Sequence, residues 1–197
     1  LYFEAANLPD VVGVSIATRP DCLSSEVISL LNELQKVTYV TVELGLQTSN
    51  ENTVKLINRC YENNIYKNAV ENLKSLGIDT ITHIIIGLPN ETFKDYQNTL
   101  QFAIDCGTDG IKLQLLHITE LYNLYCKQPF KILSLEEYVD IVIKLIERTP
   151  QNIVIHRITG DGPKEDLFEP RWSLDKRKVL NSISRGFITR CSCQGKM

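Results

Sequence analysis

The feature that most constrains the fold is a unit that recurs along the chain, in which an apolar run is followed by a loop and an amphipathic helix. The clearest copy is THIIIGLPNET, residues 82–92, where three isoleucines stand together without polar alternation. Such a run is typical of a parallel strand buried on both faces. Gly87 and Pro89 end it, because proline cannot donate a ladder hydrogen bond. Apolar residues then recur at helical spacing until Gly107, which predicts a left-handed helix cap.

The same unit is repeated at a spacing that suits βαβ units joined by right-handed crossovers, so we predict one parallel sheet. The pattern fits an open doubly wound sheet and an arc of a (β/α) barrel equally well. No domain boundary is evident before about residue 159. The predicted strands are 11–16, 39–46, 82–86, 110–118 and 152–158; the predicted helices are 27–37, a short one after Asn50, 65–76, 93–106, 134–149 and a last one ending near Gly186.

Composition favours an ordinary globular domain. The chain has 197 residues, of which 43% are hydrophobic and 23% charged, enough to bury a sizeable core. Its net charge of -3 argues against a broad nucleic-acid-binding face, although a local basic patch is compatible with it. No apolar run reaches membrane-spanning length and no basic-then-apolar leader is present, so we expect a cytoplasmic protein without a membrane partner.

The cysteines and the single methionine indicate the redox environment of the chain and its place in a longer polypeptide. Six cysteines are scattered, and we expect them to be reduced. Only Cys191 and Cys193 lie close together, and two ligands are too few for a tetrahedral metal site. Because the only methionine is Met197 and the chain opens on Leu1, we expect an internal or C-terminal piece of a longer polypeptide.

Polar residues fall on one face of the predicted sheet, since alternate strand residues point to opposite faces. Glu43 and Gln47 share a face of the second strand, and Lys112 lies on the fourth. Charges there would be costly in a dry core, which favours a cavity; the alternative is a buried Glu43–Lys112 pair that binds nothing. His83, alone inside the third strand, is more often structural than catalytic. Arg59 is either a cation at a helix C-terminus or a carboxylate clamp.

Four motifs in order, SIATRPDCL, VELGLQTSNENTVKLINR, HIIIGLPNET and GIKLQLLHI, resemble the radical S-adenosylmethionine (SAM) superfamily. They are similar to the branch with the Elongator catalytic subunit and oxygen-independent coproporphyrinogen oxidase, and within it to the uncharacterised YhcC-type proteins. A single motif such as GLP is weak, but the ordered set covers nearly the whole chain. The resemblance implies an α/β fold, a parallel-sheet arc of a partial (β/α)6 TIM-like barrel. Residues 1–158 would form the barrel from about its third strand onward, and 159–197 a C-terminal extension with a short helix.

The resemblance also implies a cofactor pair. Members hold a [4Fe–4S] cluster on three cysteines spaced C-x3-C-x2-C, and no such motif occurs here. We therefore expect the cluster ligands in an N-terminal part that is missing together with the first strands, no metal site in this segment, and no activity from the segment alone. The full-length enzyme would use an external electron donor to split SAM into methionine and a 5′-deoxyadenosyl radical. The radical would abstract hydrogen from an unknown substrate, a small molecule or an RNA.

Site residues follow from the matched motifs. Glu43 and Gln47 match positions that face SAM, and Arg59 matches an arginine that reaches the methionine carboxylate. His83 stands where relatives often carry an aspartate that binds ribose, a departure that makes the role of His83 less certain because histidine also donates and can become charged. Gly87 matches the strand end against which adenine packs.

A second group of matched residues would lie further from the methionine part of SAM. Leu116 and His117 match the place where backbone groups contact adenine. The barrel mouth would place Thr18, Arg19 and Lys112 toward the substrate, with His156 and Arg157 as weaker candidates. No catalytic residue is assigned.

Two other functions fit the same residues. One is a cluster-independent (β/α) barrel enzyme in which Glu43, Lys112 and His83 act as acid, base and electrostatic groups. The other is an RNA-binding module that uses RWSLDKRKVL, residues 171–180, where Trp172 beside Arg171 offers a stacking surface. A solvated amphipathic helix also explains that stretch.

Overall fold

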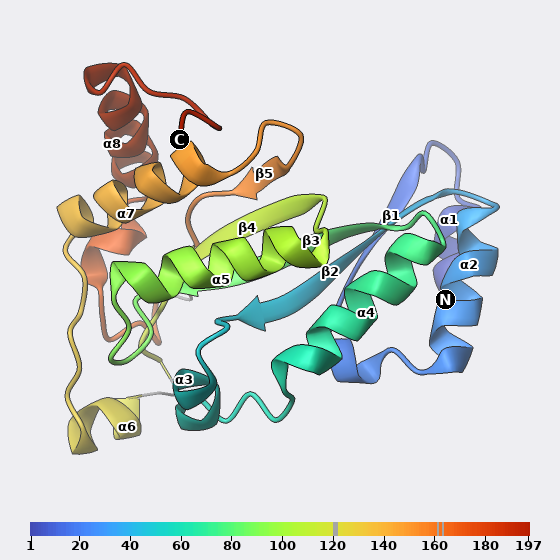
Figure 1. Ribbon diagram of the computed structural model, residues 1–197, viewed down its shortest axis with the longest axis horizontal. Coiled ribbons are helices and arrows are strands. Elements are labelled where there is room, and N and C mark those ends of the chain that lie inside the picture. The colour runs from blue at the N-terminus through green and yellow to red at the C-terminus, as the bar shows by residue number, and fades with distance from the viewer. Residues whose placement is uncertain (120–121, 161, 163) are drawn as a thin grey trace.

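The sheet is parallel throughout, and its strands follow one another in chain order. In the computed structural model, which describes residues 1–119, 122–160, 162 and 164–197, one sheet has the order β1-β2-β3-β4-β5 (Figure 1). Right-handed crossovers between strands in sequential order put every connecting helix on the same face, whereas a doubly wound sheet reverses its order. The fold is therefore a parallel-sheet arc of a TIM-like barrel. The strands are β1 Gly13–Thr18, β2 Tyr39–Gln47, β3 Asp79–Ile86, β4 Gly110–Leu115 and β5 Val154–Arg157.

Each predicted helix is present, and short elements that the periodicity does not reveal are added. The helices are α1 Tyr2–Ala6, α2 Ser25–Gln35, α3 Glu51–Leu56, α4 Asn63–Ser75, α5 Phe93–Cys106, α6 Tyr122–Lys127, α7 Leu135–Arg148 and α8 Lys176–Thr189, with 3-10 turns η1 Pro20–Cys22 and η2 Arg171–Leu174. Helices α1 and α6 and both 3-10 turns were not predicted, because segments this short carry no periodic signal.

Local chemistry sets the helix ends. Helix α5 begins with a capping box in which Thr92 and Asp95 bond each other's backbone N–H groups, and α7 begins with the same arrangement of Ser134 and Glu137. Gly107 ends α5 with a φ of 92°, a left-handed conformation that glycine adopts without steric cost. These caps confirm the predicted starts and stops of the two helices.

Strand boundaries differ from the prediction by up to three residues. The third strand begins at Asp79 rather than at 82, and the fifth covers Val154–Arg157 rather than 152–158. The first strand was predicted over 11–16 but begins at Gly13 and runs to Thr18, in register with Tyr39 to Leu44 of β2. The fourth was predicted to reach Ile118 but ends at Leu115. Beyond it, Ile118 pairs antiparallel with Glu169 instead. A partner from the C-terminal segment thus replaces the parallel ladder, which is a long-range event that strand propensity cannot report.

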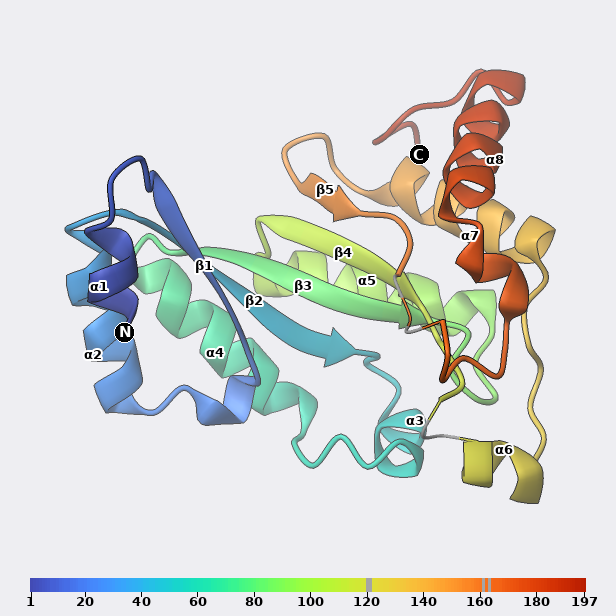
Figure 2. The same ribbon diagram turned by 180° about the vertical axis from the view of Figure 1, so that it is seen from behind.

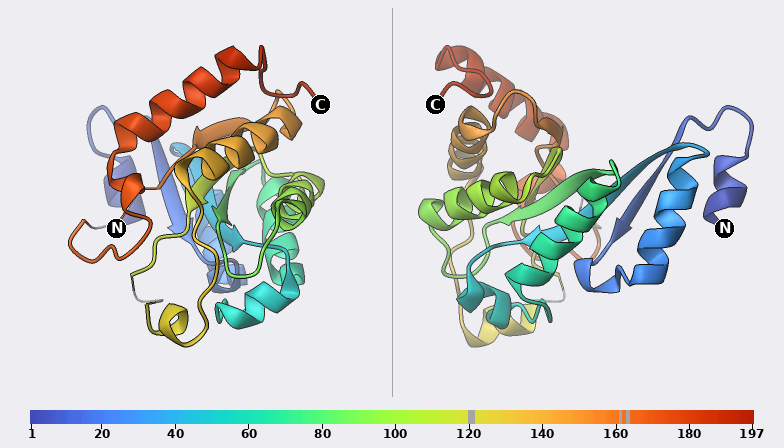
Figure 3. Two further views of the ribbon diagram at one scale, coloured as in Figure 1. Left: turned by 90° about the vertical axis from the view of Figure 1, so that its left-hand side faces the viewer. Right: turned by 45° about the vertical axis from the view of Figure 1, so that its right-hand side comes forward.

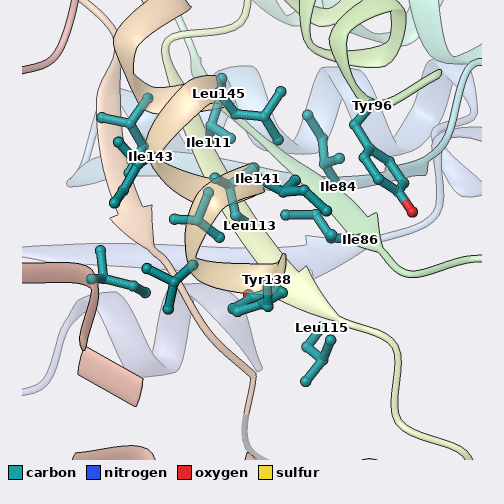
Figure 4. Close-up of a cluster of buried hydrophobic side chains, with 14 of the residues drawn as sticks. Ile84, Ile86, Tyr96, Ile111, Leu113, Leu115, Tyr138, Ile141, Ile143 and Leu145 are labelled. Atoms are coloured by element: carbon teal, nitrogen blue, oxygen red, sulfur yellow. The ribbon is translucent and has the colours of Figure 1, made fainter. Parts of the chain in front are cut away.

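The apolar core lies between the sheet and the helices on its outer face. One cluster packs β1 and β2 against α2 and α4, and the other packs β3 and β4 against α5 and α7 (Figures 3 and 4). Strand residues of alternating parity supply both, including Val42, Leu44, Ile84, Ile86 and Leu113, each at most 1% exposed. The opposite parity faces the concave side, which none of the helices in the described residues covers.

The C-terminal segment adds a further layer. Helix α8 lies across α7, where Val179 and Ile183 join the buried cluster (Figure 2). A Cβ on Gly186 would stand 2.4 Å from Ile143 Cδ1, so glycine permits the close approach of the two helices. All six cysteines are free, and no helix in the described part of the chain is long and apolar enough to cross a membrane.

Adjacent isoleucines on β3 allow a matched test of the two faces. Ile84 is fully buried against the helices, whereas Ile85 is half-buried on the concave side. Ile84→Ala leaves a cavity in packed core, and we expect it to lower the free energy of unfolding by about 2–5 kcal/mol. Ile85→Ala should cost less than half as much in the same urea titration. Equal losses would contradict the assignment of the faces.

Candidate functional site

The concave face carries a connected group of polar side chains from four neighbouring strands. Glu43 of β2 is at its centre, with Ser15 on β1, His83 on β3 and Lys112 and Gln114 on β4. The parity rule places all of them opposite the core residues of their strands. We call these five residues the inner-face network.

Each member of the network has a partner within it. The Ser15 hydroxyl donates to Glu43 Oε1 at 3.0 Å, and Lys112 Nζ donates to Glu43 Oε2. The same Oε2 lies 2.8 Å from His83 Nε2, and Gln114 Nε2 lies 3.0 Å from His83 Nδ1. The Glu43 and Lys112 side chains are only 14% and 16% exposed, so their charges are compensated mainly by each other.

The network holds Glu43 as a carboxylate. Burial by itself would raise the pKa of Glu43, but hydrogen bonds from Lys112, His83 and Ser15 and the charge of Lys112 outweigh it and lower that pKa to about 2. A base this weak is far from the pKa near neutrality that efficient proton transfer requires. Glu43 is therefore suited to fixing its partners in place rather than to accepting protons.

His83 is held neutral by the same surroundings. Burial lowers the pKa of His83, the Glu43 contact raises it, and the positive charges of Lys112 and Arg157 lower it, with a net decrease. Since Gln114 donates to Nδ1, the proton of the neutral ring sits on Nε2 and points at Glu43.

The end of β2 is irregular in a way that orients Gln47. The pairing of β2 with β3 shifts between Gly45 and Gln47, and Gln47 has a φ of 58°. The Tyr61 hydroxyl lies 3.1 Å from Gln47 Oε1 and also donates to the Gly45 carbonyl. A Cβ on Gly45 would stand 2.2 Å from Gln47 Nε2, so the side chain folds back over the glycine. Such bulges often redirect a side chain beside a site.

Arg59 is buried, and all five of its N–H donors are used by the chain itself. Its Nε and Nη2 donate to the Tyr61 carbonyl, Nη1 donates to the carbonyls of Leu46 and Thr48 at 2.8 Å each, and Nη2 also reaches Asn63 Oδ1. Arg59 thus clamps the loop after β2 onto the start of α4. A methionine carboxylate would have to displace one of these acceptors, so the predicted clamp role stays a prediction.

The loop after β3 brings Gly87 next to the end of β4. Gly87 has a φ of 94°, and a Cβ on it would lie 3.7 Å from Leu116 Cβ and 3.5 Å from Leu133 Cδ1. Leu116 N donates to the Ile86 carbonyl at 2.8 Å. His117 lies further along, where a Cβ on Gly160 would approach its Cε1 to 3.4 Å. Gly87, Leu116 and His117 thus follow the carboxyl ends of β3 and β4, and their predicted contact with adenine stays a prediction.

The predicted substrate-facing residues are divided. Lys112 belongs to the inner-face network, but Thr18 and Arg19 do not contact it in any interaction described. Arg19 makes a bidentate pair with Asp21, at 2.9 and 2.6 Å, and its guanidinium lies 5.5 Å from the centre of the Tyr61 ring. Arg157 pairs in register with Lys112, and its charge acts on His83.

Sequence reasoning missed three residues of this region, whereas parity already predicts that Gln114 shares a face with Lys112. Ser15 has the right parity but an ordinary identity, so only strand pairing reveals it. Tyr61 lies outside any strand and returns to β2 through the turn that Arg59 holds. Glu91 is largely buried and accepts from the Thr48 hydroxyl at 2.5 Å; burial raises its pKa to about 7 against the opposing hydrogen bonds of Thr48 and Thr53. No signal in the sequence distinguishes it from a solvated loop acid.

A metal site is not found in the described part of the chain, where no group of three or more histidine, cysteine or acidic side chains could hold an ion. The two cysteines Cys191 and Cys193 are exposed beyond α8.

Comparison with known families decides the classification. The model of the radical SAM superfamily matches residues 1–103, and that of the radical SAM C-terminal domain matches 108–187. The chain belongs to the radical SAM superfamily. Members of this superfamily are enzymes that use SAM with an iron–sulfur cluster.

Relatives of this radical SAM chain are longer than it is. YtqA of Bacillus subtilis, itself uncharacterized, is 44% identical over 96% of this chain and 60% of its own length. YhcC of Escherichia coli is 32% identical over 99% of the chain and 64% of its own length. The solved structure of Methanocaldococcus infernus Elp3 with an N-terminal deletion superposes with a TM-score of 0.74 and 22% identity, over 89% of this chain and 42% of that one. That likeness supports the barrel fold.

The lowered pKa of Glu43 predicts a pH-dependent part of the stability. The pKa falls from an ordinary 4.5 to about 2 on folding, so ionised Glu43 stabilises the fold above about pH 4.5, and this contribution is lost as the pH falls toward 2. Its full size is about 3 kcal/mol at most. We expect Glu43→Gln to destabilise the chain near pH 7 and to cost less than about half as much near pH 3, by urea unfolding. Glu71→Gln, at an exposed acid on α4, is the matched control; a Glu43→Gln cost that does not change with pH would contradict the network.

The neutral state of His83 can be read by NMR of its ring nitrogens. We expect a titration midpoint below 6.5 and the Nε2–H form at pH 7. Glu43→Gln should lower the midpoint further, because it removes the charge that favours the protonated ring. An Nδ1–H ring, or a midpoint that rises in the variant, would show that the assigned hydrogen bonds are wrong.

Proposed function

We propose that the protein containing this chain is a radical SAM enzyme, and that the concave face of this segment binds the nucleoside part of SAM. The observation that carries the proposal is the inner-face network, a charge-compensated set of polar side chains on the concave face of a radical SAM barrel arc. It lies beside the strand end at Gly87, whose φ of 94° suits glycine. When bound, SAM and the cluster would supply a 5′-deoxyadenosyl radical that takes a hydrogen atom from the substrate.

The residues present fit the nucleoside end. Gln47 is held by the bulge and Tyr61 at the edge of the concave face, and Gly87, which has no side chain, lets a ligand approach the backbone. A ribose hydroxyl that reaches His83 would take the place of the Gln114 amide at Nδ1, where a neutral ring offers an acceptor.

In this proposal the network orients groups and excludes water. Glu43 remains ionised and binds Lys112, so the charge on each is already compensated before any ligand arrives. Such preorganisation lowers the cost of holding a ligand in one position. Arg59 would act here by fixing the loop of Gln47, with a direct carboxylate contact as its second possible role.

The cluster does not fit the described residues, which provide neither the cysteine spacing nor another metal-binding group. We place its ligands outside this chain and assign no step of the reaction to residues here through it. Substrate, electron donor and cellular location stay proposals of the same kind: a small molecule or RNA, an external reductant, and the cytoplasm.

A cluster-independent acid–base enzyme is the second candidate, because Glu43, His83 and Lys112 are in contact. Two features weigh against it. The pKa of Glu43, at about 2, makes it a poor base, and the lowered pKa of His83 leaves it a poor proton donor near neutrality.

The test is made on the full-length protein, reconstituted anaerobically with iron and sulfide and supplied with reductant and SAM. We expect 5′-deoxyadenosine, and we expect Gln47→Ala to weaken SAM binding by about ten-fold, the effect of losing a hydrogen bond to a bound ligand. Gln101→Ala, at an exposed position of α5, is the matched control and should change neither the yield of 5′-deoxyadenosine nor the SAM affinity.

Arg59→Ala separates the two roles of that residue. If the variant lowers both the melting temperature and the SAM affinity, Arg59 holds the loop. If the variant lowers only the SAM affinity, Arg59 binds the methionine carboxylate. A folded, cluster-loaded protein that releases no 5′-deoxyadenosine would contradict the proposed function.

A further inference from the structure

A cavity of about 490 Å³ lies away from the inner-face network, where η2 meets the beginning of α8. Its volume is within the range of about 300–1,000 Å³ typical of small-molecule sites. Its lining is rich in cations: Lys164, Arg171, Lys176 and Lys178 lie there, with Asp175 as the single acid among the described lining residues.

The acid in the lining is already committed to the helix. Asp175 is the N-cap of α8, and its Oδ1 accepts the backbone N–H of Lys178 at 2.9 Å. Even without Lys176, the cations Lys164, Arg171 and Lys178 outnumber the acids of the described lining, in a protein whose overall charge is -3. Lys164, Arg171 and Lys178 are exposed, so their charged groups can turn toward a ligand. The fourteen-residue helix α8 also directs the positive end of its dipole at this place.

The wall of the cavity is held in place by the barrel. Trp172 donates from Nε1 to the Leu133 carbonyl at 2.9 Å, and its ring lies 5.6 Å from that of Tyr138. Beyond β4, Ile118 N donates to the Glu169 carbonyl at 2.8 Å and Phe168 N donates to the Ile118 carbonyl at 2.9 Å, while the Glu169 carboxylate accepts from Arg171 N. The site is thus built before a ligand binds, which reduces the entropy cost of binding.

The cavity is on the same side of the barrel as the strand ends. The segment after β5 runs past the arrowheads of β3 and β4 (Figure 2). A Cβ on Gly160 in that segment would lie 3.8 Å from the backbone N and O of Leu115, the last residue of β4. A ligand in the cavity would therefore project toward the edge at which a barrel enzyme works.

We propose that this cavity binds a phosphate group of the substrate. Several converging cations fit a group that carries two charges and several acceptor oxygens better than a single carboxylate, which one arginine fork would satisfy. The phosphate belongs either to a small phosphorylated metabolite or to a nucleic-acid backbone. That it belongs to the substrate rests on the proposed function; the binding itself does not.

The experiment measures binding without SAM, iron or reductant, so its result is independent of the radical chemistry. Pyrophosphate is titrated by calorimetry, and a short fluorescent single-stranded RNA by anisotropy. The variant K164Q/R171Q/K178Q should weaken binding by about ten-fold or more, and for RNA it should reduce the slope of log K against log salt by about 2, since each lost contact contributes about 0.7.

The control variant K36Q/K67Q/K94Q removes the same charge from exposed lysines that do not line the cavity, and should change either affinity by less than about two-fold. Thermal melting checks that both variants fold, and Arg171→Gln alone serves if the triple variant does not. Affinity that increases with RNA length identifies a nucleic-acid backbone, and equal affinity for pyrophosphate and RNA identifies a single phosphate group. No binding of either probe at millimolar concentration, or an equal loss in both triple variants, would overturn the proposal.

Discussion

Parallel strands in unbroken chain order are the constraint on which the rest of this structure depends. Each crossover returns on the same side, so the helices bury one face of the sheet and leave the other without cover. Polar residues can occupy that face only if they satisfy one another. Glu43 and Lys112 do this across three strands, with His83 between them. The concave face is consequently the place where removal of one partner would leave a buried charge uncompensated, and it is also the place where we propose that a ligand binds.

Hydrogen bonds join the loop after β2 to the loop after β3 and to the first turns of α5. Thr48 reaches Glu91, Asn50 reaches Asp95 at 3.0 Å, and the Ser49 backbone donates to Thr99 at 2.9 Å. Arg59 holds the same turn by donating to the carbonyls of Leu46 and Thr48. These hydrogen bonds connect the residues at this edge into one network. The position of the Gln47 side chain therefore depends on hydrogen bonds made several residues away.

Much of this was predictable because it depends on local pattern. Apolar runs, caps and parity gave the parallel sheet, the ends of α5 and α7 and the common face of Glu43 and Lys112, and the ordered motifs gave the family and with it the barrel. The features that the sequence did not predict depend on pairing between distant segments. Ser15 becomes a partner of Glu43 only through the register of β1 with β2. The bulge at Gln47 depends on Tyr61, and the early end of β4 depends on Glu169. For Arg59, spacing alone could not distinguish a ligand clamp from the network of carbonyls that the fold supplies.

Trp172, the single tryptophan of the chain, offers a way to follow these relationships. Its indole N–H is bonded to Leu133, its ring packs on Tyr138 of α7, and its other side lines the cationic cavity. Intrinsic fluorescence excited at tryptophan therefore originates from one point, where the C-terminal segment meets the barrel. Because indole emission depends on local polarity and on nearby charges, the chain carries its own optical sensor for the docking of that segment, without any added label.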